Sequence, residues 1–184
     1  MFERMKNKVK ELQQSMSEQN IDVVLVMDTD SVYYFTGIHD YLGMDFGRPT
    51  IAIIPQDGDI RVVVPSLEQN MARAMTWVEE LLPWTDGIGQ EWYGYIKDAL
   101  QGKKTVGLEV NKTHPMLRNY IEEAFPDIKI VDVYQTMSRQ RMVKSPEEIE
   151  IMRKAGQVAV AMCAAAREAM GAGVPEYEVA LAII

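Results

Sequence analysis

"RMVKSPEEIEIMRKAG", residues 141–156, is the stretch that divides this chain into two parts. Ser145 is a favourable N-cap because its hydroxyl can accept a hydrogen bond from a free amide of the first helical turn. Pro146 follows at the first helical position, where a missing N–H costs nothing. Glu148 stands three residues after Ser145 and completes a capping box. The stretch therefore predicts the start of a long helix.

After this start, apolar and small residues step by three and four along one helix face: Ile149, Met152, Gly156, Ala159, Cys163, Ala166 and Met170. "VAVAMCAAA", residues 158–166, is apolar on every side, so we expect this part to be buried all round. "GAGVPE", residues 171–176, predicts a C-cap and a new helix start. We expect helices over 146–170 and 174–184 to pack against a second copy of the chain. The alternative is that they fold back on the chain's own α/β domain.

Before the junction, helical and strand patterns alternate. Helices are predicted over residues 2–18, 66–75 (capped by Ser66), 89–100 and 114–125, and strands over 21–27, 50–55, 60–65, 104–110 and 128–133. The strands at 50–55 and 60–65 flank a turn at Asp57 and Gly58 and predict a hairpin. This order is typical of an α/β fold with a mixed β-sheet flanked by helices, here followed by a helical C-terminal extension.

The totals narrow the class of protein. The chain has 184 residues, with 19 Lys and Arg against 27 Asp and Glu, a net charge of −8. This acidic balance, without a basic stripe, argues against a nucleic-acid partner. The single cysteine, Cys163, excludes an internal disulfide. The N-terminus lacks the apolar core of a signal peptide, and no apolar run approaches the ~20 residues of a membrane span. We expect a cytoplasmic protein without a membrane partner.

Candidate catalytic groups are few. The two histidines, His39 and His114, do not form an HExxH-type metal pair, and His114 before a proline is interpreted as a surface or capping residue. Asp28 and Asp30 are interpreted as helix caps rather than ligands. The aromatic cluster at residues 33–35 is interpreted as core. The residues themselves therefore predict an α/β module and no reaction.

The order of three features resembles one family. "VYYFTGI" (residues 32–38) after a first strand, the hairpin, and the junction at 141–156 occur in this order in the pita-bread metallohydrolases, which include creatinase, prolidase and the Xaa-Pro aminopeptidases. The resemblance implies that residues 1–142 are a creatinase/prolidase-like N-terminal α/β domain. Residues 143–184 would then be the truncated, helical start of the pita-bread catalytic domain.

The resemblance also implies where the metal chemistry lies. The family's ligands are two aspartates, a histidine and two glutamates, all beyond the first two helices of the catalytic domain. The 184-residue chain would then hold no catalytic residue and no metal, and alone would be inactive. The full-length parent would hold two divalent metal ions, Mn, Co or Zn, that activate water.

One loop of this chain is nevertheless implied to touch substrate. In relatives, the loop after the "YFTG" segment reaches across a dimer to the partner's active site, and here that loop is "HDYLGMDFGRPT", residues 39–50. Its "FGR" resembles the creatinase loop, where a phenylalanine and an arginine face the substrate. This implies Arg48 and Phe46, and more weakly His39, as substrate-binding residues in trans. The planar fork of Arg48 could hold a carboxylate. The alternative is that Arg48 is a solvated loop residue and Phe46 a plug under the hairpin.

Three functions follow as hypotheses. The first is the N-terminal part of a metal-dependent hydrolase of C–N bonds, either an Xaa-Pro dipeptidase or aminopeptidase or a creatinase-like enzyme of small amide or guanidino compounds, acting as a homo-oligomer, most simply a dimer. The second is a non-catalytic peptide- or protein-binding module of the same fold family. The third, a nucleotide-binding protein, lacks a phosphate loop, because "GIGQEW" (residues 87–92) has no third glycine and no predicted strand before it.

Overall fold

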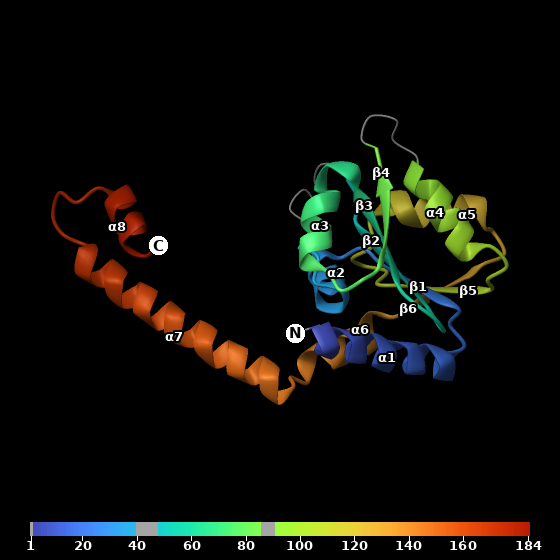
Figure 1. The fold of residues 1–184 in the computed structure, drawn as a ribbon, viewed down its shortest axis with the longest axis horizontal. Coiled ribbons are helices and arrows are strands. Elements are labelled where there is room, and N and C mark those ends of the chain that lie inside the picture. Colours follow the sequence, from blue (N-terminus) through green and yellow to red (C-terminus); the bar gives the residue numbers. More distant parts are fainter. Residues whose placement is uncertain (1, 40–47, 86–90) are drawn as a thin grey trace. The chain divides into compact units, whose positions relative to one another are not determined.

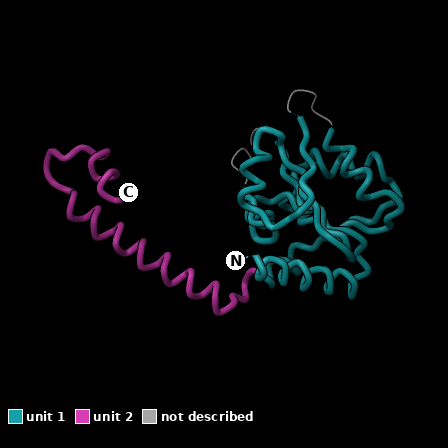
Figure 2. Tube along the Cα trace, in the orientation of Figure 1, with its two compact units in different colours: residues 1–140 teal, residues 141–184 magenta. Residues whose placement is uncertain are grey.

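The computed structural model describes residues 2–39, 48–85 and 91–184, and Figure 1 shows the elements they form. The chain separates into two compact units, residues 1–140 and residues 141–184, which Figure 2 shows in different colours. Unit 1 contains the β-sheet, and unit 2 contains the helices that follow the junction stretch.

Unit 1 is built on a six-stranded sheet with the strand order β4-β3-β2-β1-β5-β6. The strands are β1 (Val23–Val26), β2 (Ile51–Pro55), β3 (Arg61–Pro65), β4 (Glu80–Trp84), β5 (Thr105–Leu108) and β6 (Lys129–Asp132). The pairs β1–β2 and β2–β3 are antiparallel, whereas β1–β5, β3–β4 and β5–β6 are parallel. The sheet is therefore mixed, as the sequence predicts.

Strand β4 corrects the sequence interpretation. It was not among the predicted elements, and it ends shortly before "GIGQEW", so the argument that no strand precedes this glycine stretch is wrong. The missing third glycine still argues against a nucleotide-binding loop. Residues 86–90 lie outside the described part of the chain.

Helices cover both faces of this sheet, as Figure 1 shows. One hydrophobic cluster joins the first face to α1 (Phe2–Gln19), α2 (Thr29–Thr36), α3 (Gln69–Met75) and α6 (Tyr134–Met142). A second cluster joins the other face to α4 (Glu91–Leu100) and α5 (Pro115–Ala124). Alternate side chains of β1 enter opposite clusters, Val24 and Val26 the first, Val23 and Leu25 the second, because strand side chains alternate. Unit 1 is thus a three-layer α/β/α domain.

Helix α1 shows how the sequence periodicity produces this packing. Met5, Val9, Leu12 and Met16 are buried, as expected for residues three and four apart on one face. Phe2 belongs to the same predicted stripe but is 41% exposed, since the stripe loses its neighbours at the first turn of the helix. The stripe prediction is confirmed for four of its five residues.

Two local predictions need correction. Ser66 does not cap α3: it begins a short 3-10 helix, Ser66–Glu68, and the N-cap of α3 is Glu68. The aromatic cluster at residues 33–35 is only partly core. Phe35 is fully buried and Tyr34 half-buried, but Tyr33 is 43% exposed.

Unit 2 begins with the predicted capped helix, α7 (Pro146–Ala169). The amide of Ser145 donates to Glu148 Oε2 at 2.7 Å, and the amide of Glu148 donates to Ser145 Oγ at 3.2 Å, so the capping box is confirmed. The second helix is α8 (Glu176–Ala182), and the C-cap of α7 is Met170 rather than a glycine. No residue of α7 is buried in this chain, so the predicted partner around residues 158–166 stays a prediction.

Within the described residues, none of the helices has the length and apolar character needed to cross a membrane.

Candidate functional site

A candidate site lies at one edge of the sheet, where the directions of the strands bring several strand ends together. The carboxyl ends of β1, β3, β4, β5 and β6 and the start of β2 lie at this edge, because Val26 pairs with Ala52, Leu25 with Leu108, and Pro65 with Trp84. We call it the carboxyl edge. In open α/β sheets, ligands bind outside the carboxyl ends of the strands.

An ion pair fixes the centre of the carboxyl edge. Asp28 follows β1 and is the N-cap of α2, where Oδ2 accepts from the amide and from the hydroxyl of Ser31, both at 3.1 Å. Lys112 Nζ donates to the same oxygen at 3.0 Å. Burial by itself raises the pKa of the Asp28 carboxyl, but the hydrogen bond and charge of Lys112, together with Ser31, outweigh it and lower the pKa below its usual value. Asp28 is thus a cap, as predicted, whereas Asp30 lies inside the first turn.

Lys112 is held in place by the turn that follows β5. The carbonyl of Glu109 accepts from the amides of Lys112 and Thr113, both at 2.8 Å, and from the Thr113 hydroxyl at 3.0 Å. The next residue, His114, is the N-cap of α5, with Nδ1 accepting from the amide of Met116 at 3.1 Å. The capping interpretation of His114 is therefore confirmed. The turn places Lys112 next to Asp28, which follows β1.

The "YFTG" segment is held by tertiary hydrogen bonds to other elements. The Phe35 carbonyl accepts from Trp77 Nε1 at 3.0 Å, and the Thr36 carbonyl accepts from Thr76 Oγ1 at 2.6 Å. Tyr34 donates from its hydroxyl to the carbonyl of Gln140 in α6 at 3.1 Å. This segment is therefore attached to the residues after α3 and to α6.

The same segment turns the chain out of helix α2. Thr36 Oγ1 donates to the Val32 carbonyl at 2.7 Å and accepts from the Ile38 amide at 3.1 Å. Gly37 has φ 83° and ends α2 with its amide bonded to the Tyr33 carbonyl at 2.9 Å. A left-handed residue at this position is the usual way in which a helix stops. The chain leaves α2 in a fixed direction toward His39.

The sequence-predicted substrate residues lie at the two ends of the loop. His39 is exposed, and its ring centroid is 6.2 Å from that of Tyr33 in an edge-on arrangement. Arg48 is half-buried, while Pro49 and Thr50 after it are buried. Phe46 lies outside the described residues. The structure thus places His39 and Arg48 on either side of residues 40–47 and leaves their predicted role untested.

The backbone next to Arg48 is anchored to the carboxyl edge. Trp84 is buried at the end of β4, and its Nε1 donates to the Pro49 carbonyl at 3.1 Å. Arg48 therefore directly precedes Pro49, the residue whose carbonyl is anchored. The sequence alone does not indicate Trp84 or Lys112 as residues of the candidate site. Their partners lie 35 and 84 residues away in the chain, and a single sequence carries no signal for such pairs.

The carboxyl edge can position a ligand through these groups, but we find no fit for a catalytic metal. Among residues 2–39, 48–85 and 91–184, no group of three or more His, Cys, Asp or Glu side chains could hold a metal ion. The carboxylate nearest to such a role, Asp28, is already bonded to Lys112 and Ser31.

The mixed sheet between two layers of helices and the helical unit after it define the class of protein as a three-layer α/β/α domain followed by helices. The family model described as the Creatinase/Prolidase N-terminal domain matches residues 8–143. The chain therefore belongs to the creatinase/prolidase N-terminal domain family, as its resemblance to the pita-bread hydrolases implied.

Curated relatives agree with this assignment. A creatinase from Bacillus sp. (strain B-0618) is 30% identical over 97% of this chain and 43% of its own length. An Xaa-Pro dipeptidase from Pyrococcus furiosus is 31% identical over 96% of this chain and 46% of its own length. The chain thus spans less than half the length of these curated relatives.

Solved structures of both longer and shorter chains share this fold. An X-Pro aminopeptidase from Thermotoga maritima has a TM-score of 0.78 at 23% identity and covers 95% of this chain with 47% of its own. A creatinase/prolidase N-terminal domain of an X-Pro dipeptidase from Streptococcus pyogenes has a TM-score of 0.61 at 15% identity. It covers 72% of this chain with 97% of its own. At these identities the similarity is evidence of fold only.

Proposed function

We propose that this chain is the N-terminal part of a metal-dependent hydrolase that cleaves a C–N bond in an Xaa-Pro peptide or in a small amide or guanidino compound. The observation that carries the proposal is the family match over residues 8–143, joined to relatives that are a creatinase and an Xaa-Pro dipeptidase. The two relatives have nearly equal identity to this chain, so the proposal keeps both substrate classes.

In this proposal, residues 1–142 form the N-terminal domain and residues 143–184 begin a catalytic domain. Three observations support the division. The contact pattern separates residues 1–140 from 141–184, and the N-terminal domain from Streptococcus pyogenes matches only 72% of this chain with nearly all of its own length. Helix α7 also presents apolar residues to solvent, among them Val158 at 59% and Val160 at 71% exposure. Apolar surface of this extent is usually covered by a further element.

The metal chemistry would be supplied from outside the described residues. Two divalent ions, Mn, Co or Zn, would lower the pKa of bound water and polarise the scissile group. Their ligands would be carboxylates and a histidine of the catalytic domain, because residues 2–39, 48–85 and 91–184 of this chain show no cluster that could hold a metal. The contribution of the present chain is to position substrate and to hold subunits together.

The substrate-binding part of the proposal concerns Arg48. Its place beside the anchored Pro49 carbonyl gives the guanidinium a defined starting point, and a guanidinium can bind a substrate carboxylate through two parallel hydrogen bonds. Phe46 and His39 would line the same loop. We propose that this loop enters the active site of the partner subunit in a homodimer.

The experiment uses the complete protein that contains this chain, supplied with Mn, Co or Zn and assayed with an Xaa-Pro dipeptide and with creatine. Turnover of one substrate supports the proposal and selects the substrate class. Absence of turnover of both would refute it and favour a non-catalytic peptide-binding module of the same fold. Arg48→Ala should lower kcat/KM by a factor equivalent to a loss of about 2–4 kcal/mol in transition-state stabilisation, as expected for removing one partner of a buried charge pair. Arg139→Ala on α6 is the matched control, since Arg139 is exposed.

Mixed dimers test whether Arg48 acts in trans. An Arg48→Ala subunit is combined with a subunit that lacks one metal ligand. If Arg48 acts in trans, the intact metal site receives an intact Arg48 from its partner, and each mixed dimer recovers one working site. If the mixture is no more active than the two parent dimers, Arg48 acts within its own subunit; an Arg48→Ala parent with full activity would mean that Arg48 does not act at all.

A further inference from the structure

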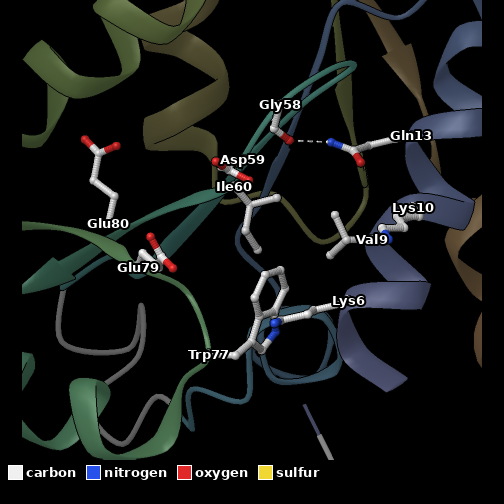
Figure 3. A pocket seen from close by; sticks show the side chains of 10 residues that line it. All are labelled: Lys6, Val9, Lys10, Gln13, Gly58, Asp59, Ile60, Trp77, Glu79 and Glu80. Atoms are coloured by element: carbon white, nitrogen blue, oxygen red, sulfur yellow. Dashed lines mark hydrogen bonds between the residues drawn. The ribbon is translucent and has the colours of Figure 1, made fainter. Parts of the chain in front are cut away.

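A hollow of about 370 Å³ lies at the edge of the sheet opposite the carboxyl edge. Figure 3 shows its lining, which comes from residues 6–13 of α1, from the turn of the β2–β3 hairpin, and from the residues that lead into β4. Residues 56–60 connect β2 to β3, and Glu80 begins β4, so the hollow is at the amino-terminal ends of β3 and β4. Neither His39 nor Arg48 lines it, and Trp77 is the lining residue that also bonds to the "YFTG" segment.

The floor of the hollow is apolar and fixed. Val9 and Ile60 belong to the hydrophobic core beneath it, and Trp77 packs against the same core. The indole of Trp77 cannot turn freely, because its Nε1 donates to the Phe35 carbonyl at 3.0 Å. A rigid aromatic ring beside two aliphatic side chains suits the apolar part of a small ligand.

The two walls carry opposite charges. Lys6 and Lys10 project from α1, whereas Asp59 is on the hairpin, Glu79 directly precedes β4 and Glu80 is its first residue. Among these five residues, all within the described chain, no ion pair joins one wall to the other. Lys6 instead lies with Nζ 5.7 Å from the centre of the Trp77 ring and 3.4 Å from Glu3 Oε1. The two charged walls therefore face each other across a space that a ligand can occupy.

The backbone of both walls is anchored. Gln13 Nε2 donates to the carbonyls of Pro55 at 3.0 Å and Gly58 at 2.9 Å, which ties the hairpin to α1. Arg73 donates to the carbonyls of Val78 at 2.7 Å and Glu79 at 2.8 Å. Gln13 thus sets the distance between α1 and the hairpin, and Arg73 fixes the backbone before β4, both without the five charged side chains that line the walls.

We propose that this hollow binds a small zwitterion of the α-amino-acid class. The carboxylate of the ligand faces Lys6 and Lys10, and its ammonium group faces Glu79 and the neighbouring acidic residues. Its apolar side chain rests on Trp77. The wall charges are solvated, so each contributes modestly, and the expected dissociation constant is on the order of 1 mM. A site of this strength responds to metabolite concentrations rather than holding a permanent ligand.

The test is titration of the chain with L-leucine, followed by isothermal calorimetry and by tryptophan fluorescence. Trp84 is 2% and Trp92 1% exposed, so a fluorescence change caused by a bound ligand reports mainly on Trp77. Saturable binding in the millimolar range, with a parallel fluorescence change, is the expected result. Calorimetry without heat and fluorescence without change up to about 50 mM leucine, some fiftyfold above the expected constant, would overturn the proposal.

Two ligand analogues test the need for both charges. L-leucinamide keeps the ammonium group and lacks the carboxylate, and N-acetyl-L-leucine keeps the carboxylate and lacks the ammonium group. Each should bind about three- to fivefold more weakly than leucine, because each loses one set of exposed charge contacts. Equal binding of all three would mean that only the apolar floor is used, and would contradict a zwitterion site.

Substitutions of the charged residues test which wall binds which end of the ligand. Lys10→Gln should weaken leucine binding about threefold and leave leucinamide binding unchanged, because leucinamide has no carboxylate to lose. Glu79→Gln should weaken leucine and leave N-acetyl-leucine unchanged, and its backbone bond to Arg73 is retained. Lys97→Gln on α4, exposed and on the other face of the sheet, is the matched control. If Lys97→Gln has the same effect as Lys10→Gln, the charge effect is non-specific and the proposal fails.

Discussion

Gly37→Ala is the substitution that probes the turn leading into the candidate substrate loop. Gly37 has φ +83°, in the left-handed region that residues with a side chain rarely adopt. A Cβ atom built on it would lie 2.8 Å from the carbonyl oxygen of Met75 and 3.4 Å from Sδ of Met5. The Met5 side chain can move aside, but the Met75 carbonyl belongs to the backbone at the end of α3. The substitution therefore adds both conformational strain and a steric conflict.

The two contributions can be estimated separately. The left-handed conformation costs about 1–2 kcal/mol for a residue with a side chain, offset by about 0.4–1 kcal/mol because alanine restricts the unfolded chain. Relief of the conflict with the Met75 carbonyl requires a backbone shift, and overpacking of this kind costs about 1–3 kcal/mol. We expect Gly37→Ala to lower the free energy of unfolding of unit 1 by about 1–5 kcal/mol, the sum of these terms.

Gly102→Ala is the matched control. Gly102 has φ +73°, close to that of Gly37, and nothing lies within 4 Å of an added Cβ. It should cost only the conformational part, about 1 kcal/mol. Urea unfolding followed by circular dichroism compares the two variants. The stability difference between them measures the steric term, and equal losses for both variants would refute the inference that the Met75 carbonyl closes this position.

Three further changes test other parts of the fold. The pKa of Asp22 is lowered chiefly by its hydrogen bond from the Lys104 amide, so its stabilisation is present above the usual carboxyl pKa and is lost as pH falls through the lowered value. Asp22→Asn should therefore cost about 1 kcal/mol at pH 7, and the loss should shrink toward pH 2–3 in pH-dependent urea titrations. Gly107→Ala would place a Cβ 2.8 Å from side-chain atoms of Val24 and Val133, and calorimetry should show a destabilisation of about 1–3 kcal/mol. Ser145→Ala should remove the α7 cap, weaken its first turn by about 1 kcal/mol, and accelerate hydrogen exchange there about fivefold; unchanged exchange would contradict this.

Local features of this fold could be predicted from the sequence, because their partners are near in the chain. The Ser145 capping box, the Asp28 cap and the His114 cap each involve residues two or three positions apart. The hydrophobic period of α1 and the hairpin turn at Gly58 are equally local. Such features need no knowledge of the tertiary structure.

The missed elements have weak local signals. β4 consists of "ELLPW", and the proline within it argues against a strand unless that strand is at an edge, where its missing N–H is tolerated. The strand order makes β4 one of the two outermost strands of the sheet. α6 has a single buried residue, Met137, so its sequence shows little periodicity. The Asp28–Lys112 pair joins residues that are 84 positions apart, and only the fold brings them together.

The "YFTG" segment, one of the features that carry the chain's family resemblance, is accounted for by structure alone. Phe35 fills the core, Thr36 bonds to the residues after α3, and Gly37 fits where an alanine Cβ would meet a carbonyl. None of these groups is left to bind a substrate, because each is either buried or engaged with the protein itself. The segment determines where the chain leaves α2, and under the proposed function the substrate contacts belong to Arg48 and its loop, not to the segment.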